Sequence, residues 1–279
     1  MYQIVAKKLL AESIKLFEIK APKVAAKAKA GQFIILRVDA EGERIPLTIA
    51  DINREAGTLT IIFQEVGYTT KKLGCLNEGD NVVDFVGPLG EPSEIENYGR
   101  IVCVGGGVGV APLYPITRAL KEAGNEVISI IGARSKDLLI LEEEMKAVSD
   151  SFMVATDDGS YGHKGFVTDL LKQVLDEKEV KQIWAIGPGI MMKVVCATTK
   201  PYEVPTIVSM NPIMVDGTGM CGACRVSVGD ETKFACVDGP EFDGHLVDWD
   251  LALRRMNIFK DEEKRAEAAG SCGGGCGCQ

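Results

Sequence analysis

The sequence predicts an antiparallel β-barrel, followed by an α/β domain with a parallel sheet and a small Cys-rich subdomain. Residues 2–90 form short apolar or alternating runs with a turn signal about every 8–12 residues, which is typical of a barrel or sandwich. After residue 99, strand and helix patterns alternate, which indicates a parallel sheet. The predicted boundaries are a barrel over 1–97, an α/β domain over 98–210, a Cys-rich subdomain over 211–246, and a helix with a Cys/Gly-rich tail over 247–279.

The barrel strands are expected within five runs, with a short helix at 71–76 before the turn at 77–80. The runs are 14–22, 31–40, 45–57, 58–67 and 77–92. We interpret them as a barrel because they are short and separated by Gly, Pro, Asn and Asp.

The α/β domain is of the Rossmann-like type. The predicted strands are 100–107, 125–134, 151–159 and 182–189, and the predicted helices are 112–124, 141–149 and 166–178. In such open sheets, ligands bind at the carboxyl ends of the strands. After the Cys-rich segment, residues 248–269 are predicted to be helical.

The composition of the chain argues against several classes of function. The chain is 46% hydrophobic and 25% charged, as in ordinary globular proteins, and its net charge of −9 argues against broad nucleic-acid binding. The longest apolar run, 101–116, is interrupted by glycines and prolines and predicts no membrane span. The start has no apolar signal core, so we expect a cytoplasmic location.

The nine cysteines are therefore expected to be metal ligands or packed thiols rather than disulfides. Asp216, Cys221, Cys224 and Cys236 supply the four anionic ligands that a [2Fe–2S] cluster requires. The glycines between them allow a loop to turn its amides toward sulfide. A zinc knuckle and unligated thiols remain as alternatives, although only one C-x-x-C unit is present.

Two further segments contain groups that suit a flavin diphosphate. Arg44 to Thr48 and Gly67 to Lys71 jointly offer a cation, hydroxyl groups and a helix amino terminus. A surface ion pair is the alternative reading of Arg44.

The turn after the first α/β strand suits a dinucleotide. Residues 105–109 are Gly-Gly-Gly-Val-Gly, and Pro112 begins the following helix. Backbone amides at such a turn can approach a pyrophosphate closely.

The order of barrel, α/β domain with GGGVGVAP and C-terminal cluster loop resembles the ferredoxin-reductase-like electron-transfer subunits. These include the subunits of dihydroorotate dehydrogenase and of NADH-dependent reduced ferredoxin:NADP oxidoreductase, and the likeness covers about residues 1–245. It implies FAD at Arg44, Pro46, Leu47, Thr48, Gly67, Thr69 and Thr70. It implies NAD(H) at Gly105, Gly106, Gly107, Val108, Gly109, Ala111, Pro112, Gly132, Ala133, Arg134, Asp157, Asp158, Gly159, Gly187, Pro188 and Met191.

Two acidic residues in this set bear on the choice of nucleotide. Asp157 and Asp158 would repel the 2′-phosphate of NADP, which favours NAD(H), although Arg134 could pair with such a phosphate. No side chain is assigned as catalytic, because the cofactors carry the redox chemistry.

Asp216 separates the subgroups of this family. The dihydroorotate-type loop reads C-G-x-G-x-C-x-x-C, and here Asp216 occupies the place of the first Cys. An aspartate with three cysteines is similar to the ferredoxin:NADP transhydrogenase subunit. That likeness implies a larger, glutamate-synthase-like flavoprotein partner with [4Fe–4S] clusters, and ferredoxin as an indirect partner.

Other readings are kept. The chain could serve dihydroorotate dehydrogenase or sulfide dehydrogenase, or it could be a zinc-stabilised nucleotide-binding regulatory module. Cys272, Cys276 and Cys278 in the tail could bind a metal or remain free thiols.

Overall fold

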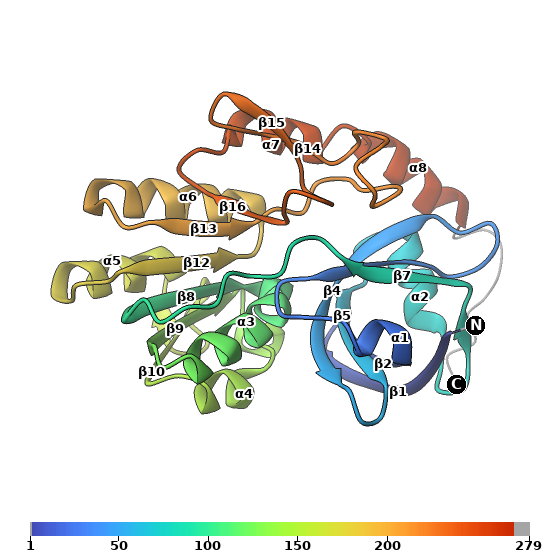
Figure 1. Cartoon of the computed structure of the whole chain (residues 1–279), viewed down its shortest axis with the longest axis horizontal. Coiled ribbons are helices and arrows are strands. Elements are labelled where there is room, and N and C mark those ends of the chain that lie inside the picture. The colour runs from blue at the N-terminus through green and yellow to red at the C-terminus, as the bar shows by residue number, and fades with distance from the viewer. Residues whose placement is uncertain (1, 271–279) are drawn as a thin grey trace.

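The computed structural model describes residues 2–270 and begins with a seven-stranded antiparallel sheet, whose strands run from dark blue to blue-green in Figure 1. The order is β6-β1-β2-β5-β4-β3-β7. Its edge strands, β6 and β7, are consecutive in the chain and separated only by Val83, so the sheet curls into a nearly closed barrel. The strands are β1 Tyr2–Ala11, β2 Ile14–Lys20, β3 Phe33–Arg37, β4 Arg44–Asn53, β5 Thr58–Gln64, β6 Asn81–Val82 and β7 Asp84–Leu89.

Two helices accompany the barrel, α1 (Pro22–Ala25) and α2 (Tyr68–Cys75). The sequence predicts α2 at 71–76, so the helix begins three residues earlier than expected. The barrel interior is filled by alternate residues of its strands, among them Phe17, Ile34 and Ile61.

The α/β domain follows with the sheet order β11-β10-β9-β8-β12-β13-β16, in which all neighbours are parallel except β13 and β16. The chain starts at β8 and adds strands first on one side and then on the other, which creates a switch point between β8 and β12. The strands are β8 Arg100–Gly106, β9 Glu126–Ala133, β10 Ser151–Thr156, β11 His163–Lys164, β12 Gln182–Ile186 and β13 Thr206–Ser209.

Helices cover both faces of this sheet (Figure 1). In β8, Ile101 and Cys103 pack with α3 and α4, whereas Val102 and Val104 pack with α5 and α6. This period of two confirms the doubly wound arrangement expected from the sequence. The helices are α3 Val110–Glu122, α4 Glu142–Ala147, α5 Val167–Glu177 and α6 Gly189–Thr199, with 3-10 turns at Gly107–Gly109, Lys136–Leu138 and Lys200–Tyr202.

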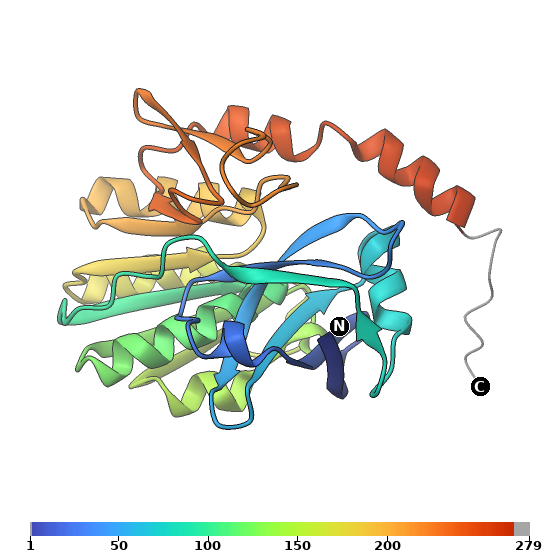
Figure 2. The same ribbon diagram turned by 45° about the vertical axis from the view of Figure 1, so that its right-hand side comes forward.

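The C-terminal segment lies above the nucleotide sheet and reaches the barrel (Figure 2). It contains the hairpin β14 (Arg225–Val228) and β15 (Glu231–Phe234), and then β16 (Glu241–Asp243), which returns to the edge of the nucleotide sheet. The predicted helix at 248–269 is two helices, α7 (Trp249–Met256) and α8 (Lys260–Gly270), and α8 packs against α2.

Candidate functional site

A cavity of about 830 Å³ lies between the barrel and the α/β domain, at the switch point of the sheet. Its volume is in the range of ligand-binding pockets. Both sets of predicted cofactor residues contribute to its wall. The predicted residues that line it are Pro46, Leu47, Thr48, Thr70, Gly106, Gly107, Val108, Gly109, Pro112, Gly132, Ala133, Arg134, Asp157, Gly187, Pro188 and Met191.

Some predicted residues lie outside this wall: Arg44, Gly67, Thr69, Gly105, Ala111, Asp158 and Gly159. The carboxylate of Asp158 accepts a hydrogen bond from the Ser160 amide at 2.9 Å. Hydrogen bonds from Ser160 lower the pKa of Asp158, so this group is an anion that stabilises its own turn.

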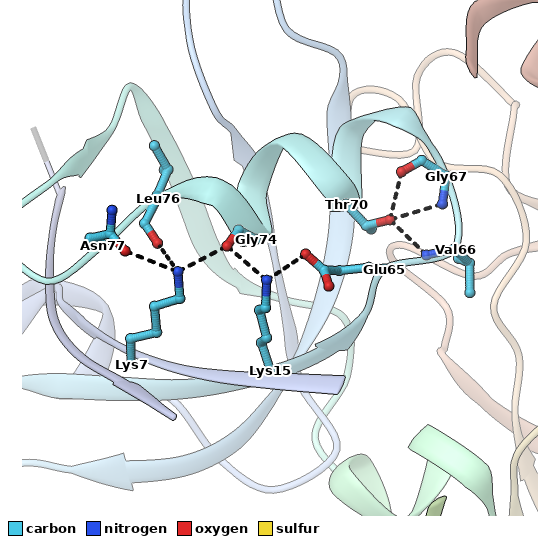
Figure 3. Close-up of polar contacts among 9 residues, drawn as sticks. All are labelled: Lys7, Lys15, Glu65, Val66, Gly67, Thr70, Gly74, Leu76 and Asn77. Carbon is cyan, nitrogen blue, oxygen red and sulfur yellow. Dashed lines mark hydrogen bonds and ion pairs between the residues drawn. The ribbon is translucent and has the colours of Figure 1, made fainter. Parts of the chain in front are cut away.

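Thr70 organises the turn that leads into α2 (Figure 3). Its hydroxyl accepts hydrogen bonds from the amides of Val66 (3.1 Å) and Gly67 (3.0 Å) and donates to the Gly67 carbonyl at 3.0 Å. The neighbouring Thr69 hydroxyl donates to Glu43 at 3.0 Å. Since both hydroxyls are engaged, the amides of the first turn of α2 are the donors left for a diphosphate.

Two lysines hold the opposite end of α2 (Figure 3). Lys7 Nζ donates to the carbonyls of Gly74 (3.0 Å) and Leu76 (2.7 Å), and Lys15 Nζ donates to Gly74 at 3.0 Å. Lys15 also pairs with Glu65 at 2.7 Å. Cations at a helix carboxyl end complement the helix dipole, so this pair fixes α2 and thereby the direction of its amino end.

The nucleotide side of the cavity is built by two turns in direct backbone contact. A Cβ added to Gly109, after β8, would lie 2.5 Å from the Ile186 carbonyl oxygen and 2.6 Å from Gly187 Cα, after β12. Only glycine at this position allows the two strand ends to come so close. The two turns therefore lie side by side, and Gly107, Gly109 and Gly187 line the same cavity.

Several cavity residues were not predicted. Ile186 and Ser209 are the last residues of the parallel strands β12 and β13, so the strand-end rule applied to those residues would have found them. Gln64 ends the antiparallel barrel strand β5, to which that rule does not apply. Others have no local signal, because their position depends on packing between distant segments. They are Ile14, Phe33, Ile62, Phe63, Val66, Leu138, Ala155, Gly165, Phe166, Val167, Thr168, Ile190, Val194, Met210, Asn211, Met214 and Pro240.

The predicted cluster ligands lie on one loop as two pairs. Cys224 and Cys236 are buried, with their sulfur atoms 3.2 Å apart. The Asp216 carboxylate accepts hydrogen bonds from the amides of Thr218 (2.9 Å) and Cys221 (3.0 Å). Within residues 2–270, no three His, Cys, Asp or Glu side chains converge as a complete metal-binding group.

The chemistry of these residues nevertheless fits an iron–sulfur cluster. Burial, followed by the neighbouring Cys224 thiol, raises the pKa of Cys236 to about 12. Two buried thiols at this distance lose their protons only beside a cation such as iron. The Thr218 amide is the main cause of a lowered pKa at Asp216, so the carboxylate of this predicted ligand is already an anion.

The loop is seated directly on the barrel. Gly217 has φ +79°, and a Cβ there would lie 2.7 Å from Ile35 Cδ1 and 2.8 Å from Leu89 Cδ1. Arg44 Nη2 donates to the Asp216 carbonyl at 3.4 Å. The loop backbone therefore touches strands β3, β4 and β7.

The cavity and the cluster loop are close neighbours. Phe33 lines the cavity, and Ile35, two residues along β3, contacts Gly217. In the same way, Pro46 lines the cavity two residues from Arg44, which bonds the loop. Two residues of strand span about 7 Å, so the two sites lie within short reach of one another.

The buried cysteines outside the predicted ligand set are packed thiols. Burial raises the pKa of Cys103 and of Cys196 to about 12, as expected for packed thiols. Within residues 2–270, every helix is too short or too polar to reach across a lipid bilayer. The tail cysteines Cys272, Cys276 and Cys278 lie outside the described residues.

Two family models match this architecture. Residues 103–197 match the oxidoreductase NAD-binding domain, and residues 211–248 match the iron–sulfur cluster binding domain of dihydroorotate dehydrogenase B.

Similar proteins extend these matches to the whole chain. The dihydroorotate dehydrogenase B (NAD(+)) electron transfer subunit homolog of Thermotoga maritima is 52% identical, over 94% of this chain and 93% of that protein. The probable dihydroorotate dehydrogenase B (NAD(+)) electron transfer subunit of Methanocaldococcus jannaschii is 37% identical, over 83% of this chain and 84% of that protein. A chain of the NADH-dependent reduced ferredoxin-NADP oxidoreductase structure, described in terms of flavin-based electron bifurcation, is 49% identical, with a TM-score of 0.93 and 98% of both chains covered.

Proposed function

The chain belongs to the family of dihydroorotate dehydrogenase B electron-transfer subunits and their homologues, and from that premise we propose that it carries electrons between NAD(H) and a larger iron–sulfur flavoprotein. When bound, FAD would exchange hydride with NAD(H), and a [2Fe–2S] cluster would exchange single electrons with the flavin. The protein supplies binding sites and the distance between them.

The observation that carries this function is the proximity of the cavity to the cluster loop. Strands β3 and β4 both pass from the cavity wall to the loop within two residues, at Phe33 to Ile35 and at Pro46 to Arg44. A third segment does the same, because Met214 lines the cavity two residues before Asp216. Such a short path suits electron transfer between a flavin and a cluster.

We assign the cavity residues according to the domain that supplies them. Pro46, Leu47, Thr48 and the amides at the start of α2 would hold FAD, and the turns at 105–109 and 187–189 would hold the NAD(H) pyrophosphate. Asp157, at the end of β10, favours NAD(H) because its carboxylate would repel a 2′-phosphate. Asp216, Cys221, Cys224 and Cys236 would ligate the cluster.

For the complex, we favour transhydrogenation among NADH, NADPH and ferredoxin, with electron bifurcation. The supporting observation is the likeness to the NADH-dependent reduced ferredoxin-NADP oxidoreductase chain, which covers 98% of both chains at 49% identity. Relatives named as dihydroorotate dehydrogenase B subunits, apart from the 52% identical homolog of Thermotoga maritima, are 32–37% identical over 76–89% of the chain. The partner would then be a glutamate-synthase-like flavoprotein with [4Fe–4S] clusters.

An anaerobic NADH titration of the purified chain tests the electron path. We expect flavin absorption near about 450 nm to bleach and the electron paramagnetic resonance signal of a reduced [2Fe–2S] cluster to appear. A preparation that binds zinc and lacks both signals after reconstitution would refute the proposal and favour the regulatory module.

Isolation of the complex from the cells that produce it tests the partner. Co-elution of a flavoprotein that contains [4Fe–4S] clusters, together with NADPH-dependent ferredoxin reduction, supports transhydrogenation. Co-elution of a dihydroorotate-oxidising or sulfide-oxidising subunit would instead assign the chain to one of those enzymes.

Redox titration of Asp216→Cys tests the cluster ligand. A carboxylate donates less charge to iron than a thiolate does, so we expect the variant cluster to have a lower midpoint potential. An unchanged or higher potential would contradict ligation by Asp216.

A further inference from the structure

Two buried guanidinium nitrogens stand out among the described residues. The buried side-chain nitrogen and oxygen atoms that have no hydrogen-bond partner in residues 2–270 are Arg44 Nε and Arg255 Nε. An unpaired buried donor on a cation is costly and is rarely retained without a function.

Both arginines hold the same loop from opposite directions. Arg44, at the start of barrel strand β4, donates through Nη2 to the Asp216 carbonyl at 3.4 Å. Arg255, in α7, donates through Nη2 to the Ala223 carbonyl at 3.1 Å. Asp216 is the first predicted ligand and Ala223 directly precedes Cys224, so the two contacts lie at the ends of the stretch that carries the first three predicted ligands.

The charge of the expected group explains why cations would be placed here. A [2Fe–2S] core with four anionic ligands is negatively charged overall, and reduction adds one more negative charge. A fixed cation nearby favours the reduced form, and nearby charges and hydrogen bonds are among the factors that set cluster potentials. Unpaired Nε–H groups beside the loop are donors available to such an anion.

We propose that Arg44 and Arg255 are positioning residues for the cluster, which fix the two ends of the stretch from Asp216 to Cys224 and raise the reduction potential of the cluster. This inference rests on the proposed function, because it requires a cluster in the loop. It also gives Arg44 a role at the cluster rather than at the flavin phosphate.

The test uses Arg44→Gln and Arg255→Gln in the full chain loaded with FAD and cluster. Two variants provide matched controls. Arg254→Gln removes the adjacent arginine of α7, which is exposed and bonds its own helix at Asp250. Arg54→Gln removes an arginine beyond the far end of β4 that, like Arg44, donates to a backbone carbonyl, that of Ala28.

The primary measurement is the cluster midpoint potential, obtained by redox titration followed by electron paramagnetic resonance. We expect each of the two Gln variants to disfavour cluster reduction by about tenfold, which is about 59 mV for a one-electron couple. The two control variants should stay within about twofold of the wild type, and the flavin potential serves as an internal reference.

Iron content and charge-preserving variants complete the design. Arg44→Lys and Arg255→Lys should restore most of the potential, because the charge remains. If the Gln variants lose iron, the Lys variants provide the test. A cluster retained in the Lys variants with a near-wild-type potential supports the proposal. Loss of iron from the Lys variants as well overturns the proposal. Gln variants with full iron content and unchanged potential also overturn it, while a wild type without a cluster signal refutes the proposed function itself.

Discussion

The substitution Gly74→Ala in α2 sets helix propensity against a neighbouring ion pair. Gly74 lies in the last turn of the helix, where alanine would ordinarily be preferred. Here an added Cβ would lie 1.8 Å from Glu65 Oε1 and 3.0 Å from Lys15 Nζ, in the middle of the contacts drawn in Figure 3.

The relative sizes of these two effects decide whether Gly74→Ala stabilises or destabilises the protein. Replacing glycine by alanine in a helix gains at most about 1 kcal/mol. The Lys15–Glu65 pair, 2.7 Å long with both side chains 19% exposed, contributes about 2 kcal/mol as a charge-assisted hydrogen bond that would have to break. Gly74→Ala is therefore expected to lower the free energy of unfolding by about 1 kcal/mol.

Without Glu65, Gly74→Ala should raise the free energy of unfolding instead of lowering it. In a Glu65→Ala background only the flexible end of Lys15 remains close to the added Cβ, at 3.0 Å, and it can move aside, so Gly74→Ala should add up to about 1 kcal/mol of stability through helix propensity. Thermal unfolding of the FAD-loaded chain, followed by circular dichroism, would report each change as a shift of about 2–4 °C per kcal/mol. A stabilising Gly74→Ala in the wild-type background, or equal effects in both backgrounds, would refute the reasoning.

Three further predictions concern the nucleotide turn, a buried acid and the cluster loop. Gly109→Ala should push apart the turns after β8 and β12, cost about 1–3 kcal/mol and weaken NADH binding with FAD retained, as measured by NADH titration and flavin content. Burial raises the pKa of Glu241 above 4.5, so the free energy of unfolding should fall as pH rises from 4.5 through the folded-state pKa. Glu241→Gln should make the melting temperature less dependent on pH over this range, and an unchanged pH dependence would contradict the prediction. Cys236→Ser should abolish the bound iron but not the flavin, whereas the control Cys75→Ser, at the end of α2, should keep both; a cluster retained in the first variant would exclude Cys236 as a ligand.

Local sequence patterns were sufficient for most barrel strands, for β8, β9, β10 and β12 of the nucleotide sheet and for the glycine turns, whereas β1, β13 and β16 were not predicted. The run 100–107 predicts β8 and its turn because an apolar strand followed by glycines has few other structures available. The beginning of α2 was harder, because it depends on one hydroxyl, that of Thr70, which caps the preceding turn. The break at 257–259 was also missed, because the sequence around it stays polar and helical in propensity on both sides.

The parts of the site that escaped prediction depend on contacts between distant segments. Phe33 reaches the cavity only because the barrel packs against the α/β domain. Strands β13 and β16 pair although the whole cluster loop separates them in the sequence, and no local pattern predicts this pairing. Arg44 was predicted as a flavin ligand, and its bond to Asp216 depends on the fold of a segment far along the chain.

The return of β16 to the nucleotide sheet also constrains how the two large domains can move. The covalent linker at 90–99 would by itself act as a hinge, but the cluster loop starts and ends in the nucleotide sheet while Gly217 rests on the barrel. The linker is fastened to the same strand, because Ser93 donates to Glu241 at 2.6 Å. The loop therefore braces the two domains against each other. We expect nucleotide entry to depend on exposed side chains that line the cavity, such as Phe166 and Ile190, rather than on rotation of a whole domain.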